Sequence, residues 1–139
     1  MAMLETPLVS GMIHRPDEAA HMMRVRPIGR EVTVRLGDEI VARSRRAVLL
    51  VEIGKDVYDP AYYLPLSDVA VDLVPTERST HCPLKGDTTY YDLGSTGERD
   101  GVEAIGWSYT EPLEWAGELR GLIAFDPAQV RIETAPLER

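Results

Sequence analysis

The sequence predicts a mainly β protein that folds as a single antiparallel β-rich domain. Three observations support this prediction. Short runs of residues alternate between apolar and polar side chains, as strands with one buried face do. Turns rich in glycine and proline separate these runs, and the 139 residues include 11 glycines and 10 prolines. Only residues 111–119 have a convincing helical pattern, so strands dominate and the sequence favours a β fold with one short helix.

The chain is expected to have three parts. A length of 139 residues fits one domain that buries a core without disulfide bonds. Residues 1–29 carry several prolines and glycines and show no sustained period, which predicts an N-terminal arm with one helical turn near 17–23. Residues 30–134 form the β-rich domain, and residues 135–139 form a C-terminal tail. We expect the arm to be the part that moves or contacts a partner.

The first half of the domain is expected to contain a hairpin and a central strand. Residues 31–36 alternate strictly, and the Gly-Asp pair that follows supplies a tight turn before the partner strand, 39–44. Residues 47–53 are apolar except for Glu52, which is typical of a strand covered on both faces. This run is therefore expected at the centre of a sheet.

The second half alternates further strands with turns. The expected strands are 62–65, 69–73, 87–93, 102–109, 121–125 and 129–133. Residues 94–101 are rich in turn formers and join two of these strands as a hairpin. The short helix covers 111–119 and has Pro112 in its first turn, where the missing N–H of proline costs no hydrogen bond.

Charge and cysteine content exclude several classes of function. The chain has 15 basic and 23 acidic residues, a net charge of −8, which would repel nucleic acid and anionic membranes on average. A single cysteine permits neither an intramolecular disulfide nor a zinc site with two thiolates. The N-terminus lacks the pattern of a secretory signal, and no apolar run reaches the roughly 18 residues of a membrane span. We therefore expect a cytoplasmic protein.

Chemically capable side chains concentrate in residues 79–91. This segment places the single cysteine, Cys82, beside His81 and continues through a Lys-Gly-Asp turn at Lys85 to the paired tyrosines Tyr90 and Tyr91. A nucleophile, a base, a cation and aromatic rings within one short segment predict that a small-molecule site uses part of it.

Strand alternation limits how these groups can cooperate. His81 and Cys82 are neighbours and should point to opposite faces, whereas Thr80 and Cys82 should share a face. A thiolate activated by histidine then requires a bend in the loop, or another histidine, His14 or His21, brought in by the N-terminal arm. Two interpretations stay open for each residue: Cys82 is a small buried hydrophobe or a nucleophile, and His81 is a structural imidazole or an acid/base group.

The remaining candidates also have two interpretations each. Lys85 holds a carboxylate or phosphate at the mouth of a pocket, or it is the solvated lysine of a turn. Trp107 and Tyr109 share a face and form either an aromatic wall or a core pair. In each tyrosine pair one ring points inward, and Tyr63 is the candidate from the first pair. Arg45 recognises an anion or makes an ordinary ion pair.

Several motifs in order resemble a known family. They are SRRA at 44–47, YYLP at 62–65, THCPLKG at 80–86, YY at 90–91, WSY at 107–109 and GLIAF at 121–125. Over about residues 32–132 the chain resembles the domain of unknown function 427 family. The resemblance implies a tent-like β topology, similar to that of zinc-binding exchange factors and methionine sulfoxide reductases, whose metal cysteines are absent here. The family also carries a nucleotidyltransferase label. Such enzymes need a Gly-Ser pair followed by spaced aspartates, and here Gly94-Ser95 is followed by Asp100 alone.

These observations predict a cytoplasmic domain that binds an unknown small molecule, with or without catalysis. The candidate catalytic residues are His81, Cys82 and Lys85, with His81 as the acid/base. The candidate ligand-binding residues are Arg45, Tyr63, Thr80, Tyr90, Tyr91, Trp107 and Tyr109. No cofactor or metal is expected, since the three histidines lack the close spacing of a helical metal pair. The alternative is a protein-interaction or structural module that forms a homodimer through a sheet edge.

Overall fold

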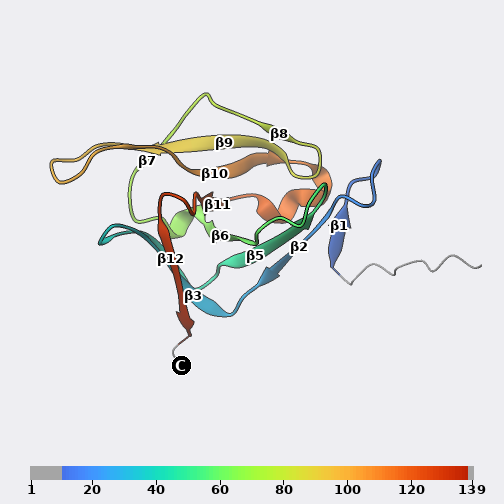
Figure 1. The fold of residues 1–139 in the computed structure, drawn as a ribbon, viewed down its shortest axis with the longest axis horizontal. Helices are drawn as coiled ribbons and strands as arrows, with labels where there is room; N and C mark the ends of the chain where they lie inside the picture. Colours follow the sequence, from blue (N-terminus) through green and yellow to red (C-terminus); the bar gives the residue numbers. More distant parts are fainter. Residues whose placement is uncertain (1–10, 138–139) are drawn as a thin grey trace, which may run out of the picture.

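The computed structural model describes residues 11–137, which form two antiparallel β-sheets and two short 3-10 helices (Figure 1). The mainly β, antiparallel prediction is confirmed, and the large sheet is curled into a half-barrel. The strands of this sheet run in the order β1-β2-β5-β6-β11-β10-β9-β7, and β8 pairs with β9. The smaller sheet has the order β12-β3-β4.

The bounds of the strands follow the predicted pattern closely in the middle of the chain. In the large sheet they are β1 Met12–His14, β2 Met22–Pro27, β5 Val48–Ile53, β6 Ala61–Pro65, β7 Leu73–Pro75, β8 His81–Cys82, β9 Gly86–Leu93, β10 Val102–Pro112 and β11 Leu122–Phe125. In the small sheet they are β3 Arg30–Leu36, β4 Glu39–Ser44 and β12 Arg131–Pro136. The predicted hairpin of β3 and β4 is present, and β5 lies inside the large sheet, between β2 and β6, as expected.

Part of the predicted N-terminal arm belongs to the large sheet. Strand β2 pairs with β5 along its whole length, and Met23 in β2 is fully buried. The predicted helical turn near 17–23 is therefore wrong. Met23 and Val25 alternate with exposed Arg24 and Arg26, a strand pattern that the surrounding prolines and glycines concealed in the sequence. Residues 1–10 of the arm lie outside the described residues.

The C-terminus also extends a sheet. Ala135 and Pro136, assigned to a tail from the sequence, are the last residues of β12 and pair with Glu31 and Arg30 of β3. Residues 138 and 139 of the predicted tail lie outside the described part of the chain.

Two predicted elements differ from the structure. The predicted strand 69–73 is mostly absent: a 3-10 helix, η1 (Leu66–Asp68), precedes an isolated bridge from Val69 to Ala42, and β7 starts only at Leu73. The Oγ of Ser44 donates to Asp68 at 2.5 Å and thereby holds this turn against β4.

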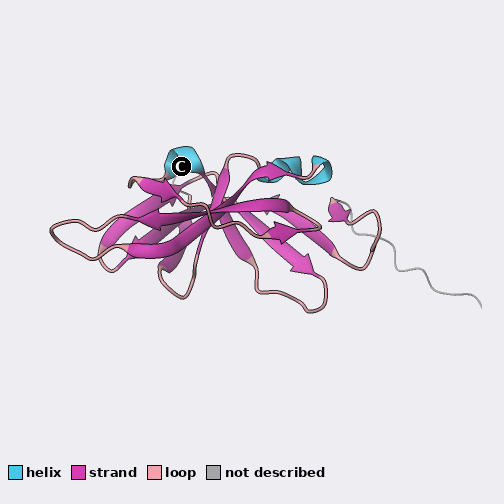
Figure 2. Cartoon of the chain, turned by 90° about the horizontal axis from the view of Figure 1, so that it is seen from above, coloured by secondary structure: helices cyan, strands magenta, loops and turns pink. Residues whose placement is uncertain are grey.

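The helix predicted at 111–119 is a 3-10 helix, η2 (Glu114–Leu119), that starts later than expected. Glu111 and Pro112 instead extend β10 by pairing with Asp87 and Gly86 of β9. In Figure 2 the two helical segments (cyan) lie along one edge of the view, and nearly all other ordered structure is strand. Among the described residues there is no helix with the length and apolar character needed to span a bilayer.

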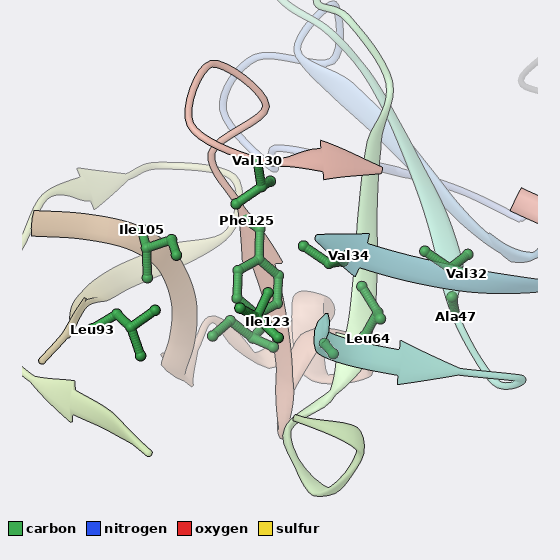
Figure 3. Close-up of a cluster of buried hydrophobic side chains, with 11 residues drawn as sticks. Val32, Val34, Ala47, Leu64, Leu93, Ile105, Ile123, Phe125 and Val130 are labelled. Carbon is green, nitrogen blue, oxygen red and sulfur yellow. The ribbon is translucent and has the colours of Figure 1, made fainter. Parts of the chain in front are cut away.

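Alternation along the strands of the large sheet separates two hydrophobic cores. The first lies against the small sheet and contains Val32, Val34, Val41, Ala42, Ala47, Leu64, Leu93, Ile105, Ile123, Phe125 and Val130. In Figure 3, Phe125 and Ile123 lie between Val34 on one side and Ile105 and Leu93 on the other. The second core lies on the opposite face and contains Met23, Leu50, Tyr63, Leu84, Tyr109, Ala116, Leu119 and Ala124. This second face carries the candidate site.

Candidate functional site

The THCPLKG motif, residues 80–86, folds into a hairpin between β8 and β9 that turns Lys85 toward the second core. His81 and Cys82 of β8 pair with Asp87 and Gly86 of β9, so the three residues between them form the turn. Leu84 in this turn is fully buried, and the indole N–H of Trp115 donates to the Leu84 carbonyl at 2.8 Å. One buried residue and one hydrogen bond from η2 thus hold the turn in place.

The ammonium of Lys85 is buried against a carboxylate and an aromatic ring. Its Nζ donates to Glu52 Oε1 at 2.5 Å and lies 5.3 Å from the centre of the Tyr109 ring. The side chains of Lys85 and Glu52 are only 12% and 11% exposed. The other oxygen of Glu52 contacts His21 Nε2 at 2.8 Å, so one carboxylate joins a lysine and a histidine.

Both members of this pair have shifted pKa values. Burial by itself lowers the pKa of Lys85, but the oxygens of Tyr109, Tyr63 and Glu52 outweigh burial and hold it above its ordinary value. Burial by itself raises the pKa of Glu52, but hydrogen bonds from His21 and Lys85 outweigh burial and lower it. Lysine and glutamate are therefore both charged at neutral pH, and Lys85 is a cation rather than a nucleophilic amine.

Acid is expected to remove the stabilisation that this pair provides. The pKa of Glu52 is lower in the folded chain than its ordinary value of 4.5, so the stabilisation is complete above that pH and is lost as the pH falls through the folded-state value. Below pH 4.5, the free energy of unfolding measured with urea should fall more steeply for the natural chain than for Glu52→Gln. Equal slopes for the two proteins would contradict this assignment.

Aromatic side chains beside Lys85 form the wall of a solvent-open cavity of about 330 Å³. Its lining residues are Leu50, Glu52, Tyr58, Asp59, Ala61, Tyr63, Lys85, Thr88, Tyr90, Trp107 and Tyr109. The Trp107 indole donates to the Tyr63 hydroxyl at 3.2 Å, and the rings of Tyr63 and Tyr109 lie 6.5 Å apart. Burial raises the pKa of Tyr63. The pKa of Tyr109 is also raised, mainly by burial and secondly by the neighbouring Tyr63. Both hydroxyls therefore stay protonated and can donate hydrogen bonds.

The structure brings five predicted residues together at this cavity: Tyr63, Lys85, Tyr90, Trp107 and Tyr109. Adjacent tyrosines separate as alternation predicts, because Tyr90 lines the cavity while the Tyr91 hydroxyl bonds to Ser108, 2.8 Å away. Thr80 reaches the cavity wall indirectly, through hydrogen bonds to the hydroxyls of Thr88 and Tyr90.

His81 and Arg45 lie elsewhere and are not among the residues that line the cavity. The His81 side chain is 62% exposed and bonds to Asp87 at 2.7 Å on the outer side of the hairpin. Arg45 is exposed at the end of β4. The role of His81 as an acid/base stays a prediction.

Cys82 points inward, opposite to His81, and meets a histidine from the N-terminal segment. Single donor atoms of His21, Glu52 and Cys82 all lie within 4.8 Å of one another. From the sequence, a thiolate activated by histidine required either a bend in the loop or a histidine from the N-terminal arm, and His21 was one of the two candidates for the second route. Glu52 was not among the predicted site residues, although it is the one charged residue in the apolar run 47–53. Its position as the lone charged residue in an apolar strand was the sequence signal that could have identified Glu52 as a site residue.

Comparison with known proteins agrees with the resemblance drawn from the motifs. No curated protein matches the sequence. A family model described as Domain of unknown function (DUF427) matches residues 24–136, which include most of β2 as well as the strands that surround the cavity. Since this match covers most of the sequence, the chain belongs to the DUF427 family.

Proposed function

We propose that this domain binds a small planar molecule in the cavity between Lys85 and Trp107. The observation that carries the proposal is a buried ammonium at a cavity walled by five aromatic side chains. Binding sites for small molecules are concave and mostly apolar, with a few polar groups that fix orientation. This cavity is concave and aromatic-walled, and it has polar side chains, among them Lys85, Asp59 and Thr88, that can fix a ligand's orientation.

The arrangement of polar groups favours a particular kind of ligand. Lys85 and the hydroxyls of Tyr63 and Tyr109 provide hydrogen-bond donors, which suit a carbonyl or carboxylate oxygen on the ligand. Asp59 is exposed and provides an acceptor, which suits an amide or amine N–H. Trp107 and Tyr90, paired across β10 and β9, present ring surfaces on which a flat molecule can stack. The preferred ligand is an aromatic or heterocyclic amide.

Lys85 acts in this proposal through charge and hydrogen bonding. A raised pKa keeps the side chain protonated, so it cannot attack a carbonyl carbon as a free amine. It can stabilise negative charge that a ligand carries or develops, as ammonium groups do in buried sites. This role is compatible with binding alone and with catalysis.

Fluorescence provides a direct test, because Trp107 and Trp115 are the two tryptophans of the chain. A library of small heterocyclic amides is screened for compounds that raise the melting temperature and change the tryptophan emission. A true ligand at one hundred times its Kd should stabilise the fold by about 2.7 kcal/mol. The emission change should persist in Trp115→Phe, and Trp107→Leu should bind at least about tenfold more weakly, since it removes the stacking surface.

Three outcomes would count against the proposal. One is a library without any stabilising compound, and another is binding that Trp107→Leu leaves unchanged. The third is a mass that rises with protein concentration in the absence of any ligand effect, which would favour the homodimeric interaction module instead.

A further inference from the structure

We propose that His21, Glu52 and Cys82 form a binding site for a zinc ion, with one coordination position left open. The three side chains supply one nitrogen, one oxygen and one sulfur donor. Zinc accepts all three kinds of ligand, and zinc sites with three protein ligands keep a fourth position for water or substrate. The site shares Glu52 with the ligand cavity proposed above, but its argument does not require that cavity to hold a ligand.

The geometry of the donor atoms supports this site. They already lie within 4.8 Å of one another. In a tetrahedral zinc site with bonds of about 2.0–2.3 Å, ligand atoms are roughly 3.3–3.8 Å apart. Side-chain movements of about 1 Å therefore suffice to bring the three atoms onto one ion, and the His21–Glu52 contact of 2.8 Å gives way to a shared metal.

Neighbouring residues orient the three donor atoms, as groups that hydrogen-bond to metal ligands do in known metal sites. Lys85 holds Glu52 Oε1 and leaves Oε2 for the metal, on the side that faces His21. Gly54 leaves room for the imidazole, because a Cβ at this position would lie 3.1 Å from Cδ2 of His21. The charges also balance, since one carboxylate and one thiolate neutralise Zn²⁺.

The open position has access to solvent. A second cavity, of about 540 Å³, is lined by His21 and by Pro83, the residue next to Cys82. It adjoins the aromatic cavity, since Tyr58 lines both, and His21 lines this cavity whereas Lys85 lines the aromatic one. Water or a small ligand can reach the metal from this side.

The sequence concealed this set of ligands. His21 precedes β2, Glu52 is in β5 and Cys82 is in β8, so more than 30 residues separate His21 from Glu52. Metal motifs are recognised in sequences by short spacings, and here strand pairing between β2 and β5 supplies the proximity instead.

Cobalt(II) is the probe for this site, because Co²⁺ occupies zinc sites and gives an absorption spectrum. Titration of the full chain with Co²⁺ should saturate at one ion per chain and produce a near-ultraviolet thiolate-to-cobalt charge-transfer band, with release of the thiol proton. Added Zn²⁺ should abolish the band. Cys82→Ser should lack the band, and His21→Gln and Glu52→Gln should bind Co²⁺ more than about tenfold more weakly.

His81→Gln is the matched control, since His81 is exposed and bonds to Asp87 outside the cluster. It should bind Co²⁺ as the natural chain does, and circular dichroism confirms that each variant is folded. The proposal is overturned if equimolar Co²⁺ gives no charge-transfer band, or if folded His21→Gln keeps the full affinity. Loss of the band in His81→Gln would likewise overturn it.

Discussion

Replacing Gly86 with alanine is expected to destabilise the fold by roughly 3 kcal/mol or more, because two separate penalties act at this position. Its φ of +119° lies in a region that residues with a Cβ rarely adopt. In addition, a Cβ would lie 2.7 Å from the carbonyl oxygen of Glu111 and 3.0 Å from the nitrogen of Leu113, both backbone atoms of the neighbouring chain segment. Urea unfolding of Gly86→Ala measures the loss.

Gly97→Ala is the control for this experiment. A Cβ at Gly97 meets no atom within 4 Å, and its φ is not positive, so the substitution should change the free energy of unfolding by less than about 0.5 kcal/mol. A similar small change for Gly86→Ala would show that the hairpin turn is not built as described. Because Lys85 precedes Gly86, a displaced turn should also weaken any ligand that depends on the ammonium.

The second large effect is expected from separating Lys85 and Glu52. Removing one member of a buried ion pair leaves the other charge without its partner and costs about 3–5 kcal/mol. Lys85→Met leaves the Glu52 carboxylate with His21, and Glu52→Gln leaves the ammonium beside the Tyr109 ring. We expect both variants to unfold at much lower urea concentration than the natural chain.

A double-mutant cycle separates this coupling from general damage. Lys85→Met combined with Glu52→Gln should lose less free energy of unfolding than the two single losses added together, by about 1–3 kcal/mol. Arg43→Met breaks the ion pair with Glu31, in which the arginine side chain is 58% exposed, and should cost about 1 kcal/mol or less. Additive losses in the cycle would contradict a direct interaction between Lys85 and Glu52.

The predicted strands were correct where a short local pattern of residues was enough to define the strand and its turn. The hairpin of β3 and β4 needs only alternation and a Gly-Asp turn, and both are local. The opposite orientations of Tyr90 and Tyr91, and of His81 and Cys82, follow from the same period of two. Prediction failed at β2, where prolines and glycines on both sides suggested an irregular arm, and at 69–73, where Ser44 holds Asp68 in a turn.

The sequence by itself determined the fold class and the family, because alternation, turn residues and motif order are local properties of the chain. Only the tertiary structure decided which groups meet. Glu52 joins His21 and Lys85, which lie 31 and 33 residues away, because β2 and β5 pair and the β8–β9 turn packs onto the same face. No local pattern encodes such proximity, since it arises from strand order and from the burial that holds the turn in place.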